Sequence, residues 1–126
     1  MSPRRRRGQR GQSTVEFALV VPLIAIALLA AFQVGLVVLT KLSVTHTARE
    51  VARALAIDPT VDPDRIANAV HPAGDDRRID VEWEPAPVGG ARMMLVRVEE
   101  RVPRLTGPVG PALRVTATVV MLGEGP

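Results

Sequence analysis

The feature that most constrains this chain is a run of 23 residues without a charge, Phe17–Leu39. At 1.5 Å per residue, a helix of this length measures about 35 Å, which is enough to cross a hydrocarbon core of about 30 Å. Gln33 is its one strongly polar side chain. Pro22 removes one backbone donor and predicts a kink, which membrane helices tolerate. The run therefore predicts a transmembrane helix.

The charges on either side of this run predict its orientation. Five of the sixteen basic residues lie in the first ten positions: Arg4, Arg5, Arg6, Arg7 and Arg10. From Lys41 onward, eleven basic and twelve acidic residues nearly balance. Because basic residues mark the cytoplasmic side of membrane helices, we expect a single-pass protein of the cell membrane with its N-terminus in the cytoplasm and its C-terminal domain outside. The arginines are then expected to contact anionic lipid of the bilayer, not nucleic acid.

A cleaved secretory signal is the competing interpretation of the N-terminus. The triplet Ala25-Ile26-Ala27 would suit a conventional signal peptidase. However, the apolar run continues for twelve residues beyond Ala27, whereas the apolar region of a signal peptide is about 7–15 residues long. Cleavage there would leave an apolar N-terminus, so we favour a retained helix.

The predicted helix continues beyond the membrane. In the segment Lys41–Ile57, small and apolar residues recur at helical spacing: Ala48, Val51, Ala52, Leu55 and Ala56. Asp58-Pro59 ends the helix, because a residue that precedes proline disfavours helical geometry. We therefore expect one helix over Ser13–Ile57. Its alanines, with Gly35 further in, would allow close packing either on the chain's own strands or on neighbouring subunits.

The remainder of the chain predicts a short helix and three strands. Asp62-Pro63 opens a helix that runs through Val70. Apolar residues then alternate with polar ones in three segments: Ile79–Glu84, about Arg92–Val102, and Leu113–Val119. Gly89-Gly90 is a candidate hairpin turn between the first two. Three strands need a cover for their apolar face.

These elements predict an α+β protein in which a small antiparallel β-meander packs on the outer half of a long N-terminal helix. We expect three parts: a basic cytoplasmic leader over residues 1–11, the transmembrane and amphipathic helix over 12–57, and a small extracytoplasmic domain over 58–126.

Glu16 stands at the entrance to the apolar run, where a charge needs an explanation. A structural one is available, because Ser13 and Glu16 have the spacing of a capping box, in which each side chain bonds the other's backbone N–H. A carboxylate in the first turn also favours the helix dipole. On this interpretation Glu16 only begins the helix.

The order of residues around Glu16 also resembles a type IV prepilin signal. In that family a membrane peptidase cuts after a glycine that ends a basic leader. Carried over to this chain, the cut falls between Gly11 and Gln12, and Glu16 becomes the fifth mature residue. The resemblance implies that Glu16 pairs with the new amine of a neighbouring subunit. Type IV pilins usually carry Phe where this chain has Gln12, which bears on N-methylation more than on cleavage.

More specifically, residues 8–57 resemble the TadE-like family of the tight-adherence (Flp) pilus machinery. The matching positions are Gly11, Val15, Glu16, Phe17, Ala18, Pro22, Gly35 and the run Ala48–Ala54. The resemblance implies a minor pilin, pseudopilin or pilus-assembly component. Its partners would be a prepilin peptidase, a secretion ATPase, other pilin-like or TadE-like subunits and the assembly platform. Glu16, Phe17, Pro22 and Gly35 would then serve helix pairing.

The other polar residues do not predict a catalytic, cofactor or metal site. His46 and His71 lack partners at metal-ligand spacing, and the chain has no cysteine. Asp75 and Asp76 adjoin two arginines and read as a charged loop. We therefore expect no enzyme, no cofactor and no small-molecule substrate. A single-pass anchor that presents a small binding module is the alternative function, and a membrane-tethered enzyme has the least support.

Overall fold

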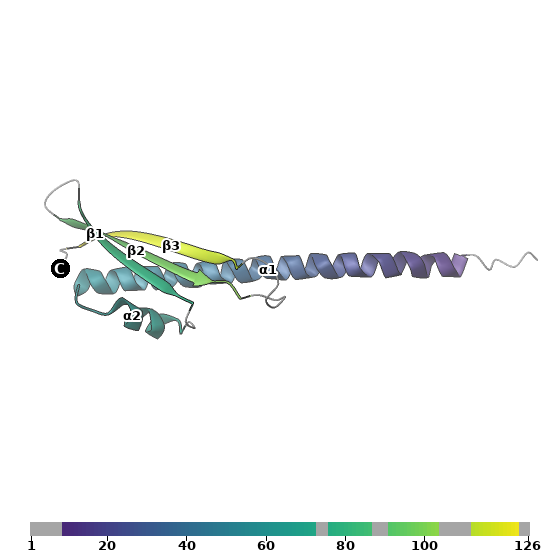
Figure 1. Cartoon of the computed structure of the whole chain (residues 1–126), viewed down its shortest axis with the longest axis horizontal. Helices are drawn as coiled ribbons and strands as arrows, with labels where there is room; N and C mark the ends of the chain where they lie inside the picture. The colour runs from purple at the N-terminus through teal and green to yellow at the C-terminus, as the bar shows by residue number, and fades with distance from the viewer. Residues whose placement is uncertain (1–8, 73–75, 87–90, 104–111, 124–126) are drawn as a thin grey trace, which may run out of the picture. The chain divides into compact units, whose positions relative to one another are not determined.

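The computed structural model describes residues 9–72, 76–86, 91–103 and 112–123, with side chains from Thr14 onward. In chain order its elements are α1 (Gln9–Ile57), α2 (Pro63–Val70), β1 (Arg78–Pro85), β2 (Arg92–Arg101) and β3 (Arg114–Gly123) (Figure 1). The chain divides into two compact units, Met1–Val34 and Gly35–Pro126, which are described separately below. A long apolar N-terminal helix and a three-stranded antiparallel sheet confirm the predicted α+β fold.

The helix α1 begins at Gln9, four residues earlier than the sequence predicted. Ser13 is therefore inside the helix and is not its N-cap, so the predicted capping box is wrong. No residue from Gln9 to Ser13 is a proline, and adding a turn to an existing helix costs far less than starting one. Gly11 alone opposes the extension, by about 1 kcal/mol relative to alanine.

In the first unit, the side chains of α1 are apolar and exposed on every side. From Thr14 to Val34 each residue is exposed except Gln33, which is half-buried. The helix passes through Pro22 without interruption. By length and composition it is a candidate membrane span. An apolar side chain gains about 1.5–3 kcal/mol on leaving water, so this surface requires a lipid or protein environment.

In the second unit, one face of α1 forms half of the hydrophobic core. The buried residues of this face are Val44, Thr47, Ala48, Val51, Ala52 and Leu55. The sequence pattern predicted four of them, Ala48, Val51, Ala52 and Leu55, whereas Ala56, which it also predicted, is half-buried. The helix ends at Ile57, where the N–H of Asp58 bonds the carbonyl of Ala54 at 2.9 Å and Pro59 prevents a further turn.

The short helix α2 has the predicted boundaries, and its cap explains them. The side chain of Asp62 accepts a hydrogen bond from the N–H of Asp64 at 3.0 Å, and Pro63 occupies the first helical position. At the other end the N–H of His71 bonds the carbonyl of Ala67 at 3.0 Å. Ala67 is buried, and it anchors α2 to the core.

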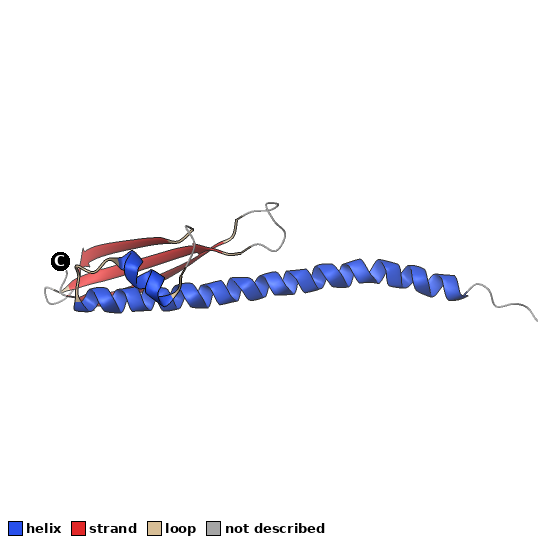
Figure 2. Ribbon diagram, turned by 90° about the horizontal axis from the view of Figure 1, so that it is seen from below, coloured by secondary structure: helices blue, strands red, loops and turns tan. Residues whose placement is uncertain are grey.

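The sheet is an antiparallel meander with the order β1-β2-β3, and it lies along the C-terminal part of α1 (Figure 2). Facing residues share a side, as in the pairs Val81 with Val96 and Val98 with Ala117. The inner face thus consists of the alternating apolar residues that the sequence predicted. The N–H of Ala86 bonds the carbonyl of Ala91 at the β1–β2 connection. The predicted turn at Gly89-Gly90 lies outside the described residues.

The third strand differs from the prediction at both ends. Leu113 precedes β3 and is exposed, although the alternation placed it on the inner face. Its carbonyl instead accepts a hydrogen bond from the N–H of Val102 at 2.9 Å. The strand continues to Gly123, so Met121 also packs against the core. A two-residue alternation indicates a strand but does not mark its ends, which pairing with β2 decides.

One ion pair lies at the edge of the core. The guanidinium of Arg77 is 3.3 Å from a carboxylate oxygen of Glu100, and these side chains are only 5% and 15% exposed. Arg77 also donates to the carbonyl of His71 at 2.7 Å. The pair therefore connects the segment after α2 to the end of β2.

Candidate processing and assembly site

The predicted cleavage point lies in the first turn of α1. Arg10, Gly11 and Gln12 follow Gln9, the first helical residue. The first four N–H groups of a helix have no intrahelical acceptor, so the backbone at Gly11 is held by fewer hydrogen bonds than the rest of α1. The predicted leader residues Arg4, Arg5, Arg6 and Arg7 lie outside the described residues.

Glu16 lies in the second turn of α1 and is exposed. The first turn contains no acidic residue, and the interaction of a charge with the helix dipole fades beyond that turn. The prediction that the helix dipole stabilises Glu16 is therefore wrong for the untrimmed chain, as is the predicted capping box. Helix initiation therefore does not explain why a carboxylate stands at the start of an exposed apolar segment.

The other predicted pairing residues lie on the surface of α1. Phe17 is exposed, and Pro22 sits within the exposed apolar segment. Gly35 is exposed too, and a Cβ placed on it would meet no heavy atom within 4 Å. Its small size is therefore not needed for packing within the chain. By contrast, Ala48 and Ala52 are buried in the chain's own core, which decides the alternatives left open for these alanines.

Within the described residues, no group of three or more His, Asp or Glu side chains could hold a metal ion. His46 is exposed on α1 and His71 caps α2. A surface hollow lined by Asp80, Glu82, Leu95 and Arg97 has room for about one water molecule. None of these features suggests chemistry.

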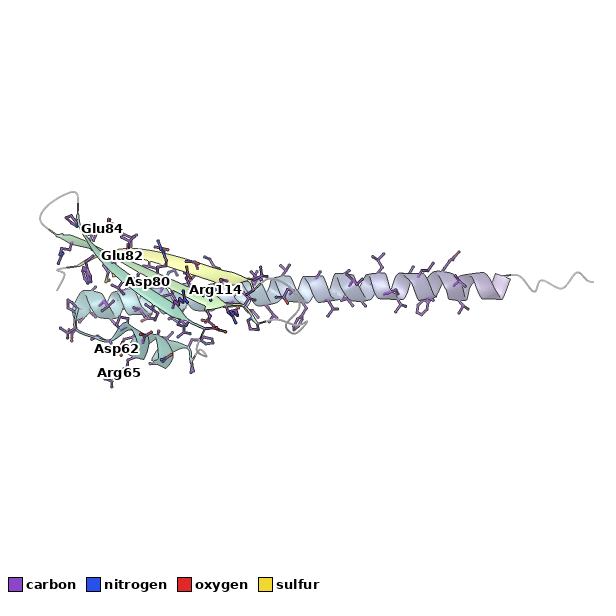
Figure 3. The ribbon with its side chains drawn as sticks, viewed as in Figure 1. Asp62, Arg65, Asp80, Glu82, Glu84 and Arg114 are labelled. Atoms are coloured by element: carbon purple, nitrogen blue, oxygen red, sulfur yellow. The ribbon has the colours of Figure 1, made fainter. Side chains whose placement is uncertain are left out.

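Sequence reasoning missed the outer face of the sheet, the face turned away from α1. Apolar side chains lie there beside acidic ones: Val120 and Leu122 are 55% and 65% exposed. Glu82 and Glu84 stand along β1, as Figure 3 shows. A signal for this face was present, because Val119-Val120 and Met121-Leu122 place apolar residues on both sides of one strand.

The comparisons with known proteins agree with the N-terminal features. Residues 11–53 match the family model described as TadE-like protein. Searches of curated proteins and of solved structures returned no match. The family match, together with a candidate N-terminal membrane helix, supports a pilus-associated membrane protein. Over residues 11–53 this chain is therefore similar to the TadE-like family, which confirms the resemblance identified from its residues.

Proposed function

We propose that this protein is a TadE-like minor pilin or pilus-assembly component, trimmed after Gly11 and anchored by α1. The observation that carries the proposal is the match beginning at Gly11. The matched segment joins this glycine, the carboxylate of Glu16 and an exposed apolar helix, in the order that a prepilin peptidase substrate requires.

Trimming would create a positive charge that Glu16 of a neighbouring subunit can bind. Cleavage makes the backbone nitrogen of Gln12 a free amine, which with a pKa of about 7.7–8.0 is largely protonated at neutral pH. Gln12 and Glu16 are four residues apart, or about 6 Å along a helix. A neighbouring subunit shifted by that distance would place its amine beside this carboxylate. Both groups would lie at the membrane boundary, where an unpaired charge is costly and a pair is favoured.

The remaining assignments follow from the same topology. The leader, residues 1–11, would be cytoplasmic and the domain at residues 58–126 extracytoplasmic. The partners would be the lipid bilayer, a prepilin peptidase, pilin-like or TadE-like subunits and the pilus assembly platform. We propose no catalytic role.

Cleavage is tested by co-expressing the full chain with a prepilin peptidase and sequencing the mature N-terminus. The expected mature protein begins at Gln12. Gly11→Ala should block trimming, and Gly8→Ala, which changes the leader's other glycine, should leave it intact. A mature protein that begins at Met1 or Ser2, or after Ala27, would refute the proposal.

The role of Glu16 is tested in a host whose pilus formation depends on this protein. Glu16→Gln keeps the shape of the side chain and removes its charge, so it should reduce pilus formation without changing membrane insertion. Thr14→Val, a nearby and nearly isosteric change, serves as the control. The alternative function, a plain anchor that presents a binding module, predicts an untrimmed chain and a silent Glu16→Gln.

A further inference from the structure

The outer face of the sheet carries an apolar area bordered by acidic residues of β1. This area lies at the end of the sheet where β3 ends. We call this the sheet patch; its residues are Glu82 and Glu84 of β1, Met93 and Leu95 of β2, and Val120 and Leu122 of β3. Strand pairing places Glu84, Met93 and Leu122 in one row and Glu82, Leu95 and Val120 in the next row of outward-facing residues. Neither carboxylate has an ion pair among the described residues. The patch thus combines uncovered apolar surface with two carboxylates that are not in ion pairs, although Arg97 lines the same surface hollow as Glu82.

The face of α1 that points away from the sheet has the complementary character. We call Arg49, Arg53 and Ile57 the helix ridge; they are spaced four residues apart and all are exposed. Ile57 is 81% exposed and the Arg53 side chain 71%. Arg53 has only a loose pair with Glu50 at 3.8 Å. The ridge therefore presents two positive charges and an apolar tip.

The sheet patch and the helix ridge lie at the same height along the domain. A Cβ on Gly123 would be 3.9 Å from the Cα of Ala56, so the end of β3 is level with the end of α1. Lys41 donates to the carbonyl of Thr116, so β3 and α1 run in the same direction. The rise per residue of each element therefore gives the height of a residue along the domain, measured from Ala56 on α1 and from Gly123 on β3.

The heights of the charges agree closely. Counting back from Ala56, Arg53 lies about 4.5 Å and Arg49 about 10.5 Å below it along the helix. Counting back from Gly123, the row of Glu84 lies about 3.3 Å and the row of Glu82 about 10 Å below it along the strand. Each arginine thus matches one glutamate without an axial shift larger than about 1.5 Å.

We infer that the sheet patch binds the helix ridge of a second copy of this chain, side by side and parallel. Arg53 would meet Glu84, Arg49 would meet Glu82, and Ile57 would cover the apolar row of Met93 and Leu122. The inference depends on the proposed function only in that copies anchored in one membrane share one orientation. It does not depend on trimming.

This contact would join two different surfaces, so each bound copy keeps one of each surface free. Such a heterologous contact continues into a row or helical filament unless the rotation between copies closes a ring. The competing interpretation is that Glu82 and Glu84 only protect the edge strand β1 from unwanted pairing. That interpretation predicts no specific contact with Arg49 or Arg53.

The absence of cysteine from the chain allows a direct test by cross-linking. Two differently tagged full-length copies, Arg53→Cys and Glu84→Cys, are co-expressed in membranes and treated with a short bis-maleimide. Each copy keeps Arg49, Glu82 and the apolar contact. The control replaces Arg53→Cys with Arg65→Cys, an exposed position on α2 (Figure 3). We expect a product carrying both tags for positions 53 and 84, and much less for 65 and 84.

Charge exchange gives an independent readout on the same cross-link. Arg49→Glu in both copies should lower the yield at least about threefold, since it replaces an attraction with a repulsion. Adding Glu82→Arg should restore it. The Gly11→Ala background should give the same yields, which separates this contact from trimming. Three results would overturn the inference: equal yields at the control position, no product between positions 53 and 84, or a loss of yield that Glu82→Arg does not restore. The same results are expected if a different subunit occupies the patch.

Discussion

Thr47 offers a test of how the core of the second unit is built, because its hydroxyl is buried without a hydrogen-bond partner among the described residues. Thr40 and Thr45, on the same helix, donate to the carbonyls four residues earlier, at 2.9 and 2.7 Å. Thr47 is fully buried on the core face of α1 and has no such bond among the described residues. Thr47→Val removes the hydroxyl and leaves nearly the same shape.

The magnitude follows from that geometry. A buried, unpaired polar group costs about 1–3 kcal/mol, and valine and threonine have similar helix propensities. We therefore expect Thr47→Val to raise the free energy of unfolding of this unit by about 1 kcal/mol. For a unit of under 100 residues this corresponds to an increase in Tm of about 4–8 °C.

The assay is thermal unfolding of the full chain in detergent micelles, followed by the fluorescence of Trp83. Trp83 is the sole tryptophan and packs against this core, so its emission reports the unfolding of the second unit. Thr45→Val is the matched control; it removes a hydroxyl that has a partner, and it should not raise Tm. An unchanged or lower Tm for Thr47→Val, or an equal rise for Thr45→Val, would refute the reasoning.

Two further predictions concern charged groups. Glu100→Gln leaves the guanidinium of Arg77 buried without its counter-charge and should lower the free energy of unfolding by about 3 kcal/mol in denaturant titrations. Asp76→Asn, which breaks the exposed pair with Arg101, should cost less than about 1 kcal/mol, and equal losses would contradict the role of burial. The hydroxyl and the N–H of Thr60 both donate to Asp58 and hold the pKa of that carboxyl below its ordinary 3.8. The stability from this depressed pKa is present above pH 3.8 and is lost as the pH falls through the folded pKa. Thr60→Ala should raise the Asp58 pKa toward 3.8 in an NMR titration, whereas Thr60→Ser should leave it low; a pKa that does not respond would exclude the Thr60 hydroxyl as the cause.

The sequence predicted the fold wherever one regular pattern was enough to identify an element. The outer part of α1 follows the spacing of Ala48, Val51, Ala52 and Leu55, and each strand follows its alternation. Proline and aspartate correctly marked the end of α1 and the start of α2. These signals are local, since backbone geometry alone relates a residue to its neighbours three, four or two positions away.

The N-terminal processing and assembly site stays a prediction, whereas the family resemblance that suggested it is confirmed. The glycine, the carboxylate and the apolar helix were identified from their order, and the family match begins at Gly11. The start of the helix was wrong because Ser13 and Glu16 have the spacing of a capping box, yet the helix extends through them to Gln9. A cap motif indicates that a helix can begin at a residue, but it does not prevent an extension into the preceding turn.

By itself, the sequence determined that this protein has a long apolar helix followed by a small α+β domain, because hydrophobic patterning dictates which segments must leave water. Only the tertiary structure decided which of the two apolar faces of β3 is buried and that Arg77 pairs with Glu100. It also placed Arg49 and Arg53 level with Glu82 and Glu84 on the opposite side of the domain. These relations join residues far apart in sequence, and their distances are set by helix-on-sheet packing and strand register, which no local pattern encodes.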